Sequence, residues 1–202
     1  MRNWGSPVAG NVYNKYQTRN PLARMLFDNF LFAARKLVES VPAKSILDVG
    51  CGEGYLTELL GRWKPGAEIC GFDLSERVFD PRVRANPRLR FSVQSAYQLA
   101  FPSGLFDLVV GAEVLEHLDS PRQALMEIRR VARHHALLSA PREPLWRMLN
   151  VARLAYLRDF GNTPGHIQHW TTDGFVHLVA EYFQIIQVST PLPWTMLLAE
   201  KR

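Results

Sequence analysis

Residues 46–54, Ile46-Leu47-Asp48-Val49-Gly50-Cys51-Gly52-Glu53-Gly54, decide how this chain folds. A short, mostly apolar run of strand character is followed at once by three glycines in alternate positions. From Tyr55 onward, apolar side chains recur at helical intervals. The pattern predicts a strand, a tight turn and a helix, and in such a turn bare backbone amides and the helix N-terminus can approach a ligand.

An acidic residue, Asp73, ends a second apolar run about twenty residues beyond the glycines. From that position a carboxylate can reach both hydroxyls of a ribose, so a cofactor that contains a nucleoside is expected. Tyr55 stands where a nicotinamide dinucleotide site normally has glycine. Asp48 is unfavourable beside a pyrophosphate but suits a cofactor with an ammonium group. The alternative is a turn whose glycines serve only the fold.

Strand-like and helical patterns alternate along the chain, which predicts an α/β fold with a parallel sheet and helices on both faces. The last two strands follow each other without a helix, so an antiparallel hairpin should close the sheet. The expected fold is a Rossmann-like, seven-stranded, mostly parallel sheet with an antiparallel last strand. We expect strands at 45–49, 68–72, 89–93, 106–110, 135–139, 183–189 and 195–199. We expect helices at 21–40, from 55, at 121–133, at 145–158 and at 171–181.

The composition is that of an ordinary globular domain. Of 202 residues, 47% are hydrophobic and 21% are charged, which excludes disordered, collagen-like and coiled-coil chains. The net charge of +5 favours solubility and anionic partners. Cys51 and Cys70 have neither metal-ligand nor disulfide spacing, so a reducing, cytoplasmic location is expected. We expect neither a secretory leader nor an integral membrane segment.

Taken together, the motifs resemble those of the class I S-adenosylmethionine-dependent methyltransferases, of the type 11 and ubiquinone-pathway O-methyltransferase kinds. Residues 46–54 resemble the first motif of that family, and Gly71-Phe72-Asp73-Leu74-Ser75 resembles the second. Residues 95–102 and 105–110 resemble the third and fourth elements. The resemblance extends from about Ile46 to Pro141, and the predicted hairpin is similar to the family's reversed seventh strand.

The resemblance implies that S-adenosylmethionine lies along the glycine turn, with Asp73 on the ribose hydroxyls and Leu74 beside the adenine. Many members have Asp where this chain has Ser95, so the contact with the adenine amino group is expected to be weaker or to come from the backbone of Ala96. The expected cofactor-binding residues are Asp48, Gly50, Cys51, Gly52, Gly54, Asp73, Leu74, Ser95, Ala96, Glu113 and Tyr16. Few catalytic side chains are needed, because the sulfonium is a good leaving group and the closed site supplies the alignment.

Glu113, Glu116 and His117 follow the fourth expected strand, at the sheet edge where open α/β folds bind ligands. If they begin a helical turn, all three lie on one side of it and can converge. Their string resembles that of small-RNA terminal 2′-O-methyltransferases and of ubiquinone-pathway O-methyltransferases, in which it is associated with a divalent cation. In the RNA group a further histidine matches His166. Mg²⁺ or Mn²⁺ held there could bind a diol or catechol and lower the pKa of the attacking hydroxyl.

A metal-free site is the alternative for the same residues. In that interpretation Glu113 closes over the cofactor, His117 is the general base and Glu116 orients it. The expected catalytic residues are Glu113, Glu116, His117 and His166, of which His166 comes from the metal interpretation. The metal ligands stay undetermined by the sequence.

We expect one domain over residues 1–202. Its parts are an N-terminal cap over 1–42, a cofactor-binding core over 43–141, a substrate-side insertion over 142–170, and the last helix and strand hairpin over 171–202. The cap offers Tyr13, Tyr16 and Asn20 as candidates for a lid over the cofactor, the alternative being that the tyrosines pack on the helix.

The insertion is expected to contain a helix over 145–158 with an apolar face and a basic stripe. The resemblance implies that such an insertion roofs the acceptor pocket; alternatively, the helix can touch an anionic membrane surface or pack onto its own domain. The expected apolar face is Leu145, Leu149, Ala152 and Tyr156, and the opposite side is Arg147, Asn150, Arg153 and Arg158.

The sequence therefore favours a methyltransferase that acts on an oxygen of a small molecule. DNA amino-methylation is disfavoured, because Ala112-Glu113-Val114 replaces the Asn/Asp-Pro-Pro-Tyr signature after the fourth strand. A metal-dependent RNA 2′-O-methyltransferase is one alternative, and an inactive cofactor-binding partner subunit is another. The arginines that could serve RNA binding are Arg82, Arg84, Arg88 and Arg90.

Overall fold

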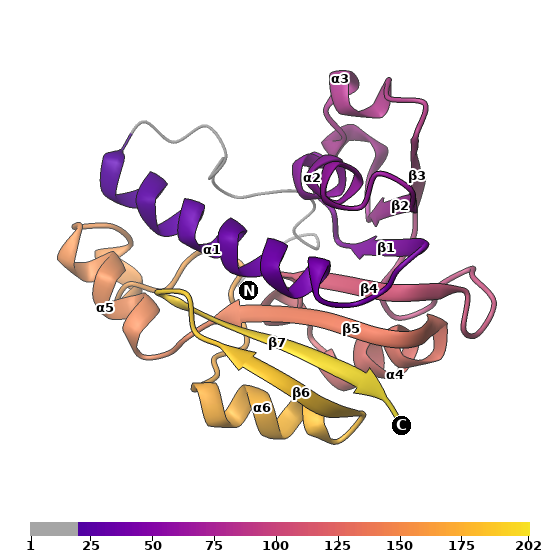
Figure 1. The fold of residues 1–202 in the computed structure, drawn as a ribbon. Helices are drawn as coiled ribbons and strands as arrows, with labels where there is room; N and C mark the ends of the chain where they lie inside the picture. Colours follow the sequence, from indigo (N-terminus) through magenta and orange to yellow (C-terminus); the bar gives the residue numbers. More distant parts are fainter. Residues whose placement is uncertain (1–19) are drawn as a thin grey trace, which may run out of the picture.

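A single seven-stranded sheet forms the centre of the molecule (Figure 1). The computed structural model describes residues 20–202. The strand order is β3-β2-β1-β4-β5-β7-β6, and β7 pairs antiparallel with both β5 and β6. The other neighbours, from β3 to β5, pair in parallel. The strands are β1 (Ser45–Val49), β2 (Glu68–Asp73), β3 (Leu89–Val93), β4 (Phe106–Ala112), β5 (Ala132–Pro141), β6 (Phe183–Ser189) and β7 (Trp194–Lys201).

Helices cover both faces of the sheet, as Figure 1 shows. α1 and α2 pack on one face through buried side chains such as Phe30 and Leu60, and α4 and α6 pack on the other through Ile128 and Phe175. The predicted α/β fold, with its reversed last strand, is confirmed. The α-helices are α1 (Pro21–Glu39), α2 (Tyr55–Trp63), α3 (Pro81–Arg84), α4 (Pro121–Val131), α5 (Leu145–Ala152) and α6 (Thr172–Ala180). The 3-10 turns are η2 (Glu76–Val78), η3 (Leu115–His117) and η4 (Leu157–Asp159).

α1 begins where the sequence predicts it. The side chain of Asn20 accepts hydrogen bonds from the backbone amides of Leu22 and Ala23, and Pro21 occupies the first helical position. Asn20, a candidate for the lid, thus caps this helix. Tyr13 and Tyr16 lie outside the described residues.

Two expected helices are shorter in the structure. The helix expected over 121–133 ends at Val131, because Ala132 is already extended and pairs with Phe106 of β4. The helix expected over 145–158 ends at Ala152, because left-handed backbone at Leu154 and Tyr156 breaks it.

The expected faces of α5 were also wrong. Asn150, which was expected on the outer side, is only 4% exposed, and Ala152, which was expected inside, is exposed. The cause is local: the Asn150 side chain donates hydrogen bonds to Gly161 O and Thr163 Oγ1. These bonds make the inner side of α5 partly polar.

From Asn20 onward, no helix combines the length and the apolar character that a membrane crossing requires.

Asp107 fastens the start of β4 to the start of β1. Its carboxylate accepts hydrogen bonds from the backbone amides of Lys44 and Ser45, and from Arg133 Nη1 at 2.8 Å. Burial alone would raise the pKa of Asp107, but these donors hold the pKa below its ordinary value of 3.8. Folding therefore favours the ionised carboxylate.

Replacing Asp107 with Ala should lower the free energy of unfolding by about 1–3 kcal/mol at pH 7, because part-buried amides lose their acceptor. The folded-state pKa is lowered, so the stabilisation is present above pH 3.8 and is lost as the pH falls through the folded value. Urea denaturation at several pH values measures both effects. The control is Asp28→Ala, which removes an exposed partner of Arg24 and should change stability by less than about 0.5 kcal/mol. Equal losses in the two variants would contradict the assignment.

Candidate functional site

The glycine turn at the end of β1 has a backbone that only glycine adopts without strain. Gly50, Gly52 and Gly54 have φ of 62°, 54° and 87°. A Cβ at Gly50 would lie 2.8 Å from the Val114 side chain, and one at Gly54 would lie 2.9 Å from Phe91. Val114, which follows β4, and Phe91 of β3 thus pack close to the turn. The turn is consequently a fixed cradle of backbone amides at the carboxyl end of β1.

Asp73, at the end of β2, is joined to this cradle. Its Oδ2 accepts a hydrogen bond from Gly52 N at 2.8 Å, and its Oδ1 accepts one from Leu74 N at 2.7 Å. The carboxylate is 6% exposed. The structure therefore brings together the two motifs that the sequence assigned to one cofactor site.

Asp48 lies beneath the same turn and is buried. Thr57 Oγ1 of α2 donates a hydrogen bond to its Oδ2 at 2.6 Å. Burial raises the pKa of Asp48 to about 7; the hydrogen bond from Thr57 opposes this shift, and the charge of Asp73 adds to it. A cation brought close to Asp48 would restore the ionised form. Burial also raises the pKa of the Cys51 thiol, which therefore stays protonated.

The remaining cofactor candidates lie at neighbouring strand ends. Leu74 follows β2 and is 40% exposed. Ser95 and Ala96 follow β3; Ser95 Oγ accepts a hydrogen bond from Tyr97 N, and Ala96 is buried. Tyr16 falls outside the described residues. The described candidates thus come from the turns after β1, β2 and β3, together with Glu113 after β4.

Glu113 leaves β4 in a left-handed conformation, with φ of 61°. Its Oε2 accepts a hydrogen bond from Trp194 Nε1 at 2.6 Å, and its Oε1 accepts one from Ser139 Oγ at 3.2 Å. Only Leu115–His117 form a helical turn. The side chain of Glu113 is therefore directed to β5 and β7, and the expectation that it shares one side of a helical turn with Glu116 and His117 was wrong.

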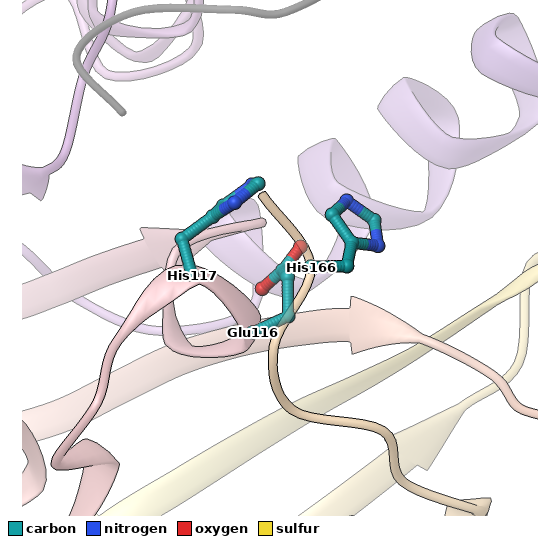
Figure 2. Close-up of side chains that lie close together, drawn as sticks. All are labelled: Glu116, His117 and His166. Atoms are coloured by element: carbon teal, nitrogen blue, oxygen red, sulfur yellow. The ribbon is translucent and has the colours of Figure 1, made fainter. Parts of the chain in front are cut away.

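Glu116, His117 and His166 do converge (Figure 2). One ligand atom from each lies within 4.8 Å of the others, and Glu116 and His166 are buried. His117 Nδ1 lies 2.9 Å from Gly165 O. A carbonyl only accepts hydrogen bonds, so Nδ1 carries a proton, and in the neutral imidazole Nε2 is then the unprotonated nitrogen. The cluster therefore offers one carboxylate and two imidazoles at the carboxyl end of β4.

The loop that carries His166 is fastened to η3 by its backbone. Ile167 N and Gln168 N both donate to Glu116 O, at 2.9 and 3.0 Å. This pairing explains how residues about fifty positions apart in sequence meet.

Trp146 packs behind the cluster and Trp194 packs on Trp146, and neither residue was predicted to border the site. The ring of Trp146 stacks on His166 with 5.8 Å between centroids, and its Nε1 donates to Thr163 Oγ1. Trp194 packs 5.5 Å from Trp146. A buried indole N–H needs a hydrogen-bond acceptor, and this requirement was the available signal. The sequence alone does not identify the acceptor.

The four arginines considered for RNA binding lie on and around α3 and β3. Arg82 forms an ion pair with Asp80 at 3.0 Å, and Arg84 pairs with Glu76. Two of the four charges are thus matched by neighbouring carboxylates.

Comparisons with known proteins agree with this geometry. A family model described as "Methyltransferase domain" matches residues 47–140. The chain is 34% identical over 130 residues to a probable chloroplastic tocopherol O-methyltransferase of Oryza sativa, covering 61% of this chain and 36% of the relative. It is 36% identical over 103 residues to a ubiquinone biosynthesis O-methyltransferase of Roseobacter denitrificans, covering 48% of this chain and 41% of the relative. The chain therefore spans less than half the length of either relative.

One similar solved structure is that of magnesium protoporphyrin IX methyltransferase from Synechocystis with bound S-adenosylhomocysteine. The TM-score is 0.67 at 18% identity, and the match covers 92% of this chain and 89% of that one. At this identity the likeness concerns the fold alone.

Proposed function

We propose that the protein is a class I S-adenosylmethionine-dependent methyltransferase, which the match of residues 47–140 to a methyltransferase-domain model supports, and that it transfers a methyl group from S-adenosylmethionine to a hydroxyl oxygen of a small molecule. The observation that carries the proposal is that Asp73 is joined to the glycine cradle at the end of β1, while the Glu116, His117 and His166 cluster is built on the turn after β4, the strand that pairs in parallel with β1. The two curated relatives, named as O-methyltransferases, support oxygen as the methylated atom.

The residues of the cradle fit the cofactor chemically. In our proposal the backbone of the glycine turn lies along the methionine part, Asp73 accepts from the ribose hydroxyls, and Asp48 faces the ammonium group. Leu74, Ser95 and Ala96 border the adenine. The bound cofactor supplies an electrophilic methyl group on a sulfonium, and the protein supplies alignment and exclusion of water.

His117 is the proposed general base. Its Nδ1–H is held by Gly165 O, so Nε2 can take the proton from the acceptor hydroxyl as oxygen attacks the methyl group. Glu113 is a positioning residue in this proposal, because Trp194 and Ser139 fix its carboxylate at the sheet edge. We also propose that residues 1–202 form one domain, which is divided into cap, core, insertion and hairpin. We propose a cytoplasmic location as well, and the two free cysteines support it.

As the alternative to a metal-free site, we propose that the cluster can hold a divalent cation, in which case His117 Nε2 is a ligand and no longer the base. Glu116, His117 and His166 present a buried carboxylate and two imidazoles within 4.8 Å, and the hydrogen bond from His117 Nδ1 to Gly165 O would hold the ring with Nε2 free to bind the ion. Two nitrogen ligands suit Mn²⁺ better than Mg²⁺, which prefers oxygen. Such an ion would lower the pKa of an acceptor hydroxyl.

Binding of S-adenosylhomocysteine should release a proton from Asp48. At pH 6 this carboxyl is mostly protonated, because its pKa is raised to about 7, and the ligand's ammonium group favours the ionised form. Calorimetric titrations in phosphate and in imidazole buffers measure the release. 5′-Methylthioadenosine, which lacks the amino-acid part, should release none, and neither should Asp48→Asn with either ligand. Equal release by Asp48→Asn and the unmodified protein would contradict the placement of Asp48.

His117→Ala should reduce methyl transfer about 100-fold or more, because the general base is lost, while affinity for S-adenosylhomocysteine stays unchanged. Transfer from radiolabelled S-adenosylmethionine to a panel of catechols and hydroquinones measures the reaction, and calorimetry measures the affinity. His134→Ala, at the opposite end of β5, is the matched control and should retain full activity. An active His117→Ala enzyme would reject the base assignment, and an unmethylated panel would reject this acceptor class.

Mn²⁺ titrated into protein saturated with S-adenosylhomocysteine should bind at one site. Glu116→Gln should weaken that binding about 10-fold or more, because an anionic ligand becomes neutral. Glu181→Gln, an exposed carboxylate that pairs with Arg122, is the control and should leave the binding unchanged. Absence of binding to the unmodified protein would leave a metal-free site with His117 as base.

A further inference from the structure

Residues 145–161 form a small lobe made of α5, a turn and η4, which Figure 1 shows at the margin of the molecule, beyond the sheet. Large apolar side chains on this lobe are directed to solvent. Leu154 and Phe160 are both 78% exposed, which few side chains of this size are in a folded domain. The exposed apolar residues of the lobe are Met148, Val151, Leu154, Leu157 and Phe160.

The two most exposed of these side chains stand on strained backbone. Leu154 and Phe160 have φ of 59° and 49°, and Tyr156 between them has φ of 55°. Non-glycine residues seldom adopt this left-handed conformation, and bulky ones seldom do so without a structural or functional cause. Here the strained conformation holds apolar side chains outward instead of burying them. Strain and apolar exposure therefore coincide at the same residues.

Hydrogen bonds hold the lobe in this shape. Asn150 Nδ2 donates to Gly161 O at 2.8 Å, and Arg147 Nε donates to Phe160 O at 3.1 Å. Gly161 N donates to Tyr156 O at 2.9 Å. A Cβ at Gly161 would lie 2.3 Å from Arg147 O, so the chain passes very close to α5 at this point. These hydrogen bonds and this close packing thus hold the exposed apolar side chains in a defined arrangement.

The charges of the lobe are mainly positive. The lobe contains three arginines, Arg147, Arg153 and Arg158, and one acidic residue, Asp159. Its net charge is therefore +2 (three minus one). Arg153 and Arg158 are exposed. Leucine and phenylalanine side chains at a tip, with arginines beside them, are the combination that enters the boundary between lipid headgroups and acyl chains.

We propose that the 145–161 lobe docks on an anionic lipid surface. Leu154, Leu157 and Phe160 enter the headgroup boundary, and Arg153 and Arg158 meet the phosphates. The positive charge selects an anionic surface over a neutral one. The lobe lies on the surface and does not cross it.

The docked lobe would place the candidate site next to the lipid. Trp146, on the inner side of α5, stacks on His166, so the lobe and the cluster share a wall. An acceptor dissolved in lipid could then reach the site without crossing water. This consequence for the acceptor rests on the proposed function, whereas the docking itself does not.

Flotation of the full chain with vesicles tests the proposal. Binding is expected to phosphatidylcholine vesicles with about 30% phosphatidylglycerol, and much less to phosphatidylcholine alone. The variant Leu154→Asn/Phe160→Asn should bind about 10-fold more weakly. Asparagine tolerates left-handed backbone, so this variant should keep or raise the melting temperature. It therefore separates loss of docking from loss of folding.

The matched control, Val93→Thr/Met126→Gln, changes two exposed apolar residues on β3 and α4 and should bind as the unmodified protein does. Arg158→Glu should weaken binding to the anionic vesicles only. The proposal is overturned if the unmodified protein stays unbound, or if the asparagine variant binds equally well. It is also overturned if sedimentation shows self-association that the asparagine variant abolishes, because a second copy would then cover the lobe. Since vesicle binding is measured without methyl transfer, the outcome is independent of the proposed function.

Discussion

The glycine turn after β1 is the constraint on which the rest of the structure depends. Its three left-handed glycines lie between Phe91 of β3 and Val114 beyond β4, and each would meet strain or a close contact if it carried a side chain. Asp73 fastens the turn by accepting from Gly52 N. Because these contacts hold the turn in place, the ends of the strands around it meet at one site. Asp48, on the buried strand β1 just before the turn, is itself buried, and its raised pKa is the electrostatic consequence of that packing.

Much of the fold and half of the site could be predicted from the sequence because their signals are local. The glycine turn, the acidic end of β2 and the alternation of strands with helices each lie within a few residues of one another, so spacing alone identifies them. The starts of α1 and α6 were predictable for the same reason, and the structure shows that the capping side chains of Asn20 and Thr171 bond to amides two or three residues away. The reversed β7 follows from the two apolar runs that no helix separates.

The features that sequence reasoning missed depend on contacts between distant segments. Glu113 was expected beside Glu116 and His117, but a hydrogen bond from Trp194, 81 positions later, directs its side chain to β7. Asn150 was placed on the outer face of a long helix because its partners, Gly161 and Thr163, belong to a loop whose path the periodicity does not describe. The early end of α5 has the same cause, since left-handed residues without glycine have no sequence signature.

Trp146 connects the strained lobe with the candidate site. Its ring stacks on His166, its indole N–H bonds to Thr163, and Thr163 in turn accepts from Asn150, the residue that fastens the lobe. The shape of the exposed segment and the position of one cluster histidine are therefore fixed by the same few buried contacts. Because the interior is closely packed, the position of His166 depends on the same contacts that shape the lobe. This is the physical reason to treat residues 145–166 as one unit with the carboxyl edge of the sheet.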